Sequence, residues 1–171
     1  MAITIAQETA EILADRPESL RISTKTSETD VVTQMDKLAE DYIVEQLQSA
    51  FPEDGILGEE GAAKESKSGF QWVIDPLDGT INYLYHLPAW AVSIARVDIN
   101  SGSSTVGVVC APALNSTYFA ATGLGAYKNS LKMKLGVGST ADLAQSLIGT
   151  GFSYRSEVRA GQARVLSELL P

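Results

Sequence analysis

The sequence predicts an α/β fold in which helices pack on a largely antiparallel sheet. Residues 91–98, 104–110 and 117–121 follow one another across short turns and are rich in strand-forming side chains, which is typical of consecutive antiparallel strands. Residues 33–51 instead repeat apolar side chains at helical spacing. The chain has 171 residues, of which 44% are hydrophobic and 20% charged, so it is large enough for one domain with its own core.

The first helix and the first strand are predicted from the spacing of apolar residues and from a proline that ends the helix. Residues 5–14 carry apolar side chains at helical spacing, and Pro17 forbids the helix from continuing. Residues 19–26 alternate Leu, Ile and Thr with polar side chains, which indicates a strand. Lys25 lies at the end of that strand, where we expect a solvated surface charge.

The helix over residues 33–51 has a defined beginning. Thr33 and Asp36 have the spacing of a capping box, in which Asp replaces the usual Glu. That cap is a complete structural role for Asp36, and we favour it over direct ligation. The carboxylate also lies at a positive helix end, where it could face a metal through water. The apolar stripe of this helix comprises Met35, Leu38, Ala39, Tyr42, Ile43, Leu47 and Ala50.

Two carboxylates follow a short apolar strand at residues 72–74. Asp75 and Asp78 lie three residues apart, Gly79 relaxes the turn, and Thr80 is a candidate helix N-cap. Carboxylates hold a hard cation, and the N–H groups of a first helical turn hold an anion. The stretch therefore predicts a metal beside a phosphate. An Asp-Pro turn before a capped helix would need no ligand, and this stretch alone leaves that alternative open.

A second acidic motif, Glu59-Glu60, follows an apolar strand at residues 56–58. If Leu57 points into the core, alternation points Glu59 the same way. An inward carboxylate is costly unless it is paired or bound to a metal. Residues 62–69 form a polar loop, which we expect to be mobile, and they return the chain to the strand before the first motif. The carboxylates predicted to converge are Glu59, Asp75 and Asp78, with Asp36 and Glu60 near them.

Single residues exclude several other kinds of metal or catalytic site. Leu77 stands where an EF-hand loop needs an oxygen ligand. Cys110 lies in a Val-rich strand and has Ser116, not Arg, six residues later, so we expect a buried core thiol and no cysteine nucleophile. His86 is the only histidine, which excludes a multi-histidine zinc site. The Gly-Leu-Gly at residues 123–125 opens no helix and is predicted to be a turn.

Charge and composition restrict the partners. The net charge is −8, which disfavours a nucleic-acid backbone or an anionic membrane. Acidic walls also repel a phosphate ester unless divalent cations invert the local field. A single cysteine allows no internal disulfide and is typical of a reducing compartment. No apolar run has membrane-spanning length, and the N-terminal residues show no basic region before an apolar one. We therefore expect a soluble cytoplasmic protein that binds neither nucleic acid nor membrane.

Taken together, these motifs resemble the N-terminal half of the inositol monophosphatase family, in its bacterial inositol-1-monophosphatase branch. The resemblance rests on residues 31–36, 56–61 and 72–82, in that order. It continues through further stretches and covers essentially the whole chain. Those stretches are residues 88–95, 107–112, 121–126 and 149–152.

The resemblance implies an αβαβα sugar-phosphatase-like architecture with a six-stranded antiparallel sheet and Mg²⁺ as cofactor. Glu59, Asp75 and the carbonyl of Leu77 would hold the first Mg²⁺. Asp75 and Asp78 would share the second. Asp36 would touch the metal cluster more loosely.

The same resemblance implies the catalytic and phosphate-binding roles. Thr80 with Glu59 would orient and activate the attacking water, and Asp78 would take part through the second metal. The backbone N–H groups of Gly79 and Thr80 would meet the phosphate. Glu60 would lie behind the ligands, and Lys25 matches a lysine of the same region.

The implied reaction is Mg²⁺-dependent hydrolysis of a small phosphate monoester, with inositol-1-monophosphate as the preferred substrate. Histidinol phosphate, fructose bisphosphate or a nucleotide 3′-phosphate remain alternatives, as does a catalytically weak metal- or phosphate-binding module. The family continues with a Gly-Ser-Ala-Ala segment that lines the substrate pocket and a Trp-Asp motif that completes the second metal site. We therefore expect residues 1–171 to be the N-terminal metal-binding half, without its C-terminal half, of a protein that is a homodimer when full length.

Overall fold

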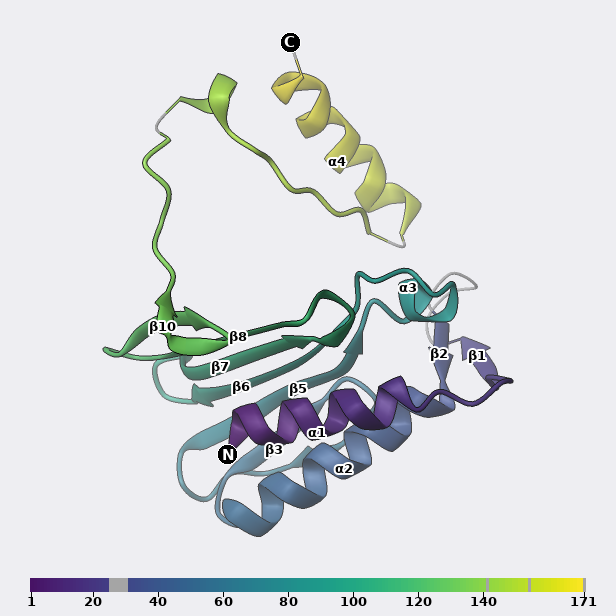
Figure 1. Ribbon diagram of the computed structural model, residues 1–171, viewed down its shortest axis with the longest axis vertical. Helices are drawn as coiled ribbons and strands as arrows, with labels where there is room; N and C mark the ends of the chain where they lie inside the picture. The colour runs from purple at the N-terminus through teal and green to yellow at the C-terminus, as the bar shows by residue number, and fades with distance from the viewer. Residues whose placement is uncertain (25–30, 141, 154, 171) are drawn as a thin grey trace. The chain divides into compact units, whose positions relative to one another are not determined.

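The computed structural model describes all residues except 25–30, 141, 154 and 171 (Figure 1). The contacts divide the chain into two units, which are described separately. The first comprises residues 1–23 and 32–136, and the second comprises residues 24–31 and 137–171.

The described part of the first unit contains an eight-stranded sheet in the order β10-β9-β8-β7-β6-β5-β3-β4. Only the pair β3 and β5 is parallel; the other neighbours are antiparallel. The fold class predicted from the sequence is therefore confirmed. The strands are β3 (Gly55–Gly58), β4 (Ala63–Lys64), β5 (Phe70–Asp78), β6 (Ala91–Asp98), β7 (Ser103–Ala111), β8 (Ser116–Ala121), β9 (Gly125–Lys128) and β10 (Ser130–Lys134).

Two helices, α1 (Ala2–Ala14) and α2 (Gln34–Ala50), lie side by side along one face of this sheet (Figure 1). Their buried stripes pack on the inward side chains of the central strands and form the core. Ile5 and Leu13 of α1 and Ile43 and Leu47 of α2 are completely or almost completely buried. Burying each such side chain contributes about 1.5–3 kcal/mol to the free energy of unfolding. The core thus forms between the helices and one face of the sheet.

Short elements complete the chain. In the first unit, α3 (Thr80–Leu84) follows β5, and a 3₁₀ turn, η1 (Pro112–Leu114), joins β7 to β8. β1 (Ile22–Thr24) and β2 (Val31–Thr33) pair in a two-stranded sheet. The second unit contains η2 (Leu143–Gln145) and α4 (Ser156–Leu169). None of the described helices is long and apolar enough to span a bilayer.

Three expectations about the elements need correction. The sheet has eight strands within the described residues, not the six that the resemblance implies; its edge strands are β4, which has two residues, and β10, which is exposed throughout. The predicted strand over residues 19–26 is described only as Ile22–Thr24, and Lys25 lies outside the described residues. Leu38 is 50% exposed and is not part of the buried stripe of α2.

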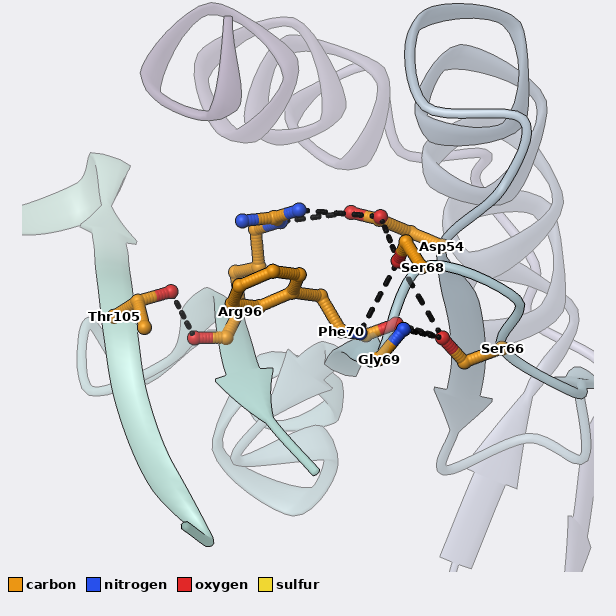
Figure 2. A network of polar contacts seen from close by, with 7 residues as sticks. All are labelled: Asp54, Ser66, Ser68, Gly69, Phe70, Arg96 and Thr105. Carbon is orange, nitrogen blue, oxygen red and sulfur yellow. Dashed lines mark hydrogen bonds and ion pairs between the residues drawn. The ribbon is translucent and has the colours of Figure 1, made fainter. Parts of the chain in front are cut away.

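The loop between β4 and β5, which we expected to be mobile, is tied down by a polar network (Figure 2). Arg96 of β6 contacts the buried Asp54 through Nε at 2.7 Å and through Nη2 at 3.1 Å. Ser68 donates to the same carboxylate at 2.6 Å, while Ser66 donates to the carbonyl of Phe70 at 2.7 Å. The guanidinium lies 3.8 Å from the centre of the Phe70 ring. The network therefore fixes where β5 begins.

Candidate metal site

The parallel pairing of β3 and β5 brings the two acidic motifs to one edge of the sheet. Gly58 is paired with Ile74, so the residues that follow them, Glu59 and Asp75, leave the sheet side by side. The Glu59 N–H donates to the Ile74 carbonyl at 3.0 Å, which extends the pairing to Glu59 itself. The predicted convergence of Glu59 and Asp75 is therefore present in the structure.

The acidic side chains face away from the helices. Ile56 is 2% exposed and packs in the core, whereas Leu57 is 49% exposed, so the assumption that Leu57 points inward is wrong. Alternation still places Glu59 on the same side as Leu57, and Glu59 is exposed. The reason for the error is that both residues are apolar, and only packing against α1 and α2 decides which one enters the core. Glu59 consequently lies outside the core.

The pKa of the Asp75 carboxyl is shifted by its neighbours. Burial raises the pKa of this carboxyl, and the carboxylates of Glu59 and Asp78 raise it further, to about 7. The Leu77 N–H donates to Asp75 Oδ1 at 3.2 Å and acts in the opposite direction. Three acidic side chains that raise one another's energy form a donor set that a divalent cation would stabilise.

A bulge separates the two aspartates of the second motif. Asp75 pairs with Ser93 and Asp78 pairs with Ala91, so β5 has one residue more than β6 across this interval. The extra residue breaks the alternation, buries Leu77 at 2% exposure and leaves Asp78 exposed. The bulge thereby lets both carboxylates leave the sheet near its end.

Gly79 and Thr80 join this strand to α3. Gly79 has a φ of +86° and is the N-cap residue, so the prediction that Thr80 is the N-cap is wrong by one position. A Cβ on Gly79 would come within 2.7 Å of the Ala89 carbonyl. Thr80 is the first residue of the helix, and its hydroxyl lies within hydrogen-bonding distance of two acceptors, Asp36 Oδ1 at 2.9 Å and the Leu77 carbonyl at 3.1 Å.

Asp36 performs the capping role expected of it. Its Oδ2 accepts from the Thr33 N–H at 2.8 Å and from the Thr33 hydroxyl at 2.7 Å, which completes the capping box of α2. Its Oδ1 accepts from Thr80, a contact that spacing in the sequence could not indicate. Asp36 is 1% exposed. The start of α2 is thereby joined to the end of the second acidic motif.

Among the described residues, no group of three or more His, Cys, Asp or Glu side chains is placed to hold a metal ion by itself. The arrangement still fits Mg²⁺, which binds through one or two carboxylates, keeps several waters and takes further oxygens from a substrate phosphate. The acidic residues that carry this fit are Glu59, Asp75 and Asp78.

Sequence reasoning missed two buried carboxylates. No local pattern distinguishes Asp54, because its partner Arg96 is 42 positions later. Glu40 interrupts the apolar face of α2 between Ala39 and Ile43, and this interruption was a usable signal. Glu40 is completely buried.

The whole chain, residues 1–171, matches the model of the inositol monophosphatase family. The chain belongs to this family. It is 40% identical over 154 residues to the Nus factor SuhB of Xylella fastidiosa, with 90% of this chain and 54% of that protein covered. It is 37% identical over 153 residues to the fructose-1,6-bisphosphatase/inositol-1-monophosphatase of Thermotoga maritima, with 85% and 57% covered.

A solved structure supports the fold. The extragenic suppressor protein suhB of Bartonella henselae superposes with a TM-score of 0.89 at 28% identity, covering 99% of this chain and 65% of that one. The chain spans little more than half the length of the curated relatives it matches. The match therefore establishes the family and the layered α/β fold.

Proposed function

We propose that residues 1–171 form the N-terminal metal-binding half of a phosphatase that hydrolyses a small phosphate monoester with Mg²⁺. The preferred substrate is inositol-1-monophosphate. The observation that carries the proposal is the placement of Glu59 beside Asp75, with Asp78 near enough to act on the pKa of Asp75, in a member of the inositol monophosphatase family.

Four groups would hold the metal ions. They are the carboxylates of Glu59, Asp75 and Asp78 and the carbonyl of Leu77, with Asp36 behind them. When bound, Mg²⁺ supplies positive charge that neutralises the ester phosphate and makes a water molecule more acidic. Without that charge, a chain of net charge −8 would repel its substrate.

Thr80 and Glu59 would prepare the attacking water. The Thr80 hydroxyl has one hydrogen, and its two observed acceptors both lie within the protein. Its oxygen can therefore accept a hydrogen bond from the water and orient it. The Glu59 carboxylate would take the proton of that water. The N–H groups of Gly79 and Thr80 would meet the phosphate oxygens.

Hydrolysis of inositol-1-phosphate, with and without Mg²⁺, by a protein in which the proposed C-terminal half accompanies residues 1–171 tests the proposal. Asp78 is exposed, so Asp78→Asn should fold normally but lose most of the Mg²⁺-dependent turnover. One lost charge contact to the transition state costs roughly 2.7–4 kcal/mol, or about 10²–10³ in rate. Unchanged turnover together with a large loss of metal-free stability would make Asp78 a structural residue and contradict the proposal.

Fructose-1,6-bisphosphate is the second substrate to assay, because the relative from Thermotoga maritima carries both activities in its name. A higher kcat/KM for the bisphosphate would reassign the substrate and leave the metal chemistry in place. Mg²⁺ binding without hydrolysis of either ester would instead favour a metal-binding module.

A further inference from the structure

α2 buries a second carboxylate one turn after Asp36. Glu40 is 0% exposed, and none of the roles proposed above uses it. Burial of a carboxylate is costly unless hydrogen bonds replace the water that it loses. Its hydrogen-bond partners therefore indicate what this position does.

Both oxygens of Glu40 bind the turn that carries Glu59. The Glu60 N–H donates to Oε2 at 2.8 Å, and the Ala62 N–H donates to Oε1 at 3.0 Å. Lys37 approaches Oε1 at 3.4 Å from the protein surface. A carboxylate that accepts two backbone N–H groups fixes both the position and the orientation of the segment that donates them.

Gly58 makes room for this contact. A Cβ at Gly58 would lie 2.1 Å from Glu40 Oε2 and 2.6 Å from Cδ, so the carboxylate occupies the space of the missing side chain. The Gly58 N–H also donates to the Ala62 carbonyl at 2.7 Å and closes the turn. Gly58, Glu40 and the turn therefore interlock directly before and after Glu59.

We propose that Glu40 is a positioning residue for the Glu59 carboxylate, a role that rests on the metal-dependent function proposed above. Asp36 and Glu40 are four positions apart and lie on the same face of α2. Asp36 holds Thr80 of the second acidic motif, and Glu40 holds the turn of the first. The helix thus sets the spacing between the two acidic segments.

Glu40→Gln tests this role with little change of shape. Glutamine has one acceptor oxygen and an NH₂ group, so it cannot accept from both N–H groups of the turn. Loss of a partner that orients a metal ligand typically weakens metal binding about 10- to 100-fold. We expect the Mg²⁺ dissociation constant, measured by isothermal titration calorimetry on the full chain, to rise by about tenfold or more. Amide exchange of Glu60 and Ala62 should be faster in the metal-free variant.

Two variants of the same helix separate positioning from stability. Glu45→Gln changes an exposed glutamate and should leave both Mg²⁺ binding and amide exchange unchanged. Ile43→Val removes a methylene from the core and should lower the melting temperature without changing the Mg²⁺ dissociation constant.

Gly58→Ala provides an independent route to the same effect. The added methyl group would displace the Glu40 carboxylate, so this variant should weaken Mg²⁺ binding in the same direction. In a Glu40→Ala background only the 3.1 Å approach to the Ala62 Cβ remains, and Gly58→Ala should add much less than its loss in the wild type. Additive losses would mean that Gly58 acts independently of Glu40 and would contradict the proposal.

The outcomes are distinguishable. Wild-type protein that binds no Mg²⁺ overturns the proposed function, and the exchange rates of Glu60 and Ala62 then still decide whether Glu40 holds the turn. Wild-type protein that binds Mg²⁺, with Glu40→Gln binding equally well, overturns the inference alone. A loss of affinity in Ile43→Val that matches the loss in Glu40→Gln would reduce Glu40 to a stabilising residue.

Discussion

At the scale of single residues, the Asp75 carboxyl lies where burial, Glu59 and Asp78 all disfavour its charge, so its pKa rises from 3.8 to about 7. In the metal-free protein this carboxyl holds its proton more tightly in the folded state than in the unfolded state. Its contribution to stability is therefore fully present below pH 3.8 and is lost as the pH rises through about 7. A bound divalent cation reverses this preference, because it stabilises the ionised carboxylate.

We expect the metal-free protein to lose melting temperature between about pH 5 and pH 8, and Asp75→Asn to lose less over the same interval. Mg²⁺ should raise the melting temperature of the wild type by linkage, and more at pH 8 than at pH 6, because protons compete for Asp75 at the lower pH. Thermal unfolding across this range, with and without Mg²⁺, measures both effects. If Mg²⁺ did not raise the melting temperature, or raised it more at pH 6 than at pH 8, the assignment of Asp75 to a metal site would be contradicted.

At the scale of elements, periodicity predicted β6, β7, β8 and α2 within about one residue, because each buries a repeating apolar face. The pattern of apolar residues in the sequence could not show whether Ile56 or Leu57 enters the core, since both are apolar. It also missed β9 and the edge strands β4 and β10, which bury little. The convergence of Glu59 and Asp75 was predictable because each follows an apolar strand, whereas the partners of Glu40 and Asp54 depend on contacts distant in sequence.

The ion pair between Arg96 and Asp54 joins β6 to the turn before β3. Arg96→Ala should lower the free energy of unfolding by about 3 kcal/mol at pH 7, because it leaves the buried Asp54 carboxylate without its partner. Denaturant unfolding measures the loss. Asp54→Asn combined with Arg96→Ala should recover part of it, since no buried charge then remains.

Unfolding in acid tests whether the effect of Arg96→Ala depends on the charge of Asp54. Burial raises the pKa of Asp54, but the hydrogen bonds from Arg96 and Ser68 outweigh it, so the pKa lies below 3.8. The stability that Asp54 contributes is present above pH 3.8 and is lost as the pH falls through its lowered folded pKa. The difference between wild type and Arg96→Ala should therefore narrow in acid. A constant difference from pH 7 to pH 3 would mean that Arg96 acts through packing on Phe70 instead.

At the scale of the whole molecule, the first unit buries one face of its sheet under α1 and α2 and leaves apolar side chains exposed on the other. Val73 and Val109 are 37% and 39% exposed, and Tyr118 lies beside Val109 on the neighbouring strand. A hollow of about 310 Å³ is lined mainly by residues of β6 to β9, among them Val109, Tyr118 and Ser93, which pairs with Asp75. Neighbouring apolar side chains exposed on one face of a sheet are candidates for an interface.

We therefore expect the 171-residue chain to be poorly soluble or to self-associate, with an apparent mass that rises with concentration in sedimentation velocity. Val109→Lys places a charge on the apolar face and should shift the protein toward monomer, because an interface would have to desolvate that charge. Ile99→Lys alters an apolar residue in the turn after β6 that is 50% exposed, more than the 39% of Val109, and should leave association unchanged. A wild-type chain that stays monomeric at all concentrations, or an equal effect of both lysines, would show that this face of the sheet does not drive association.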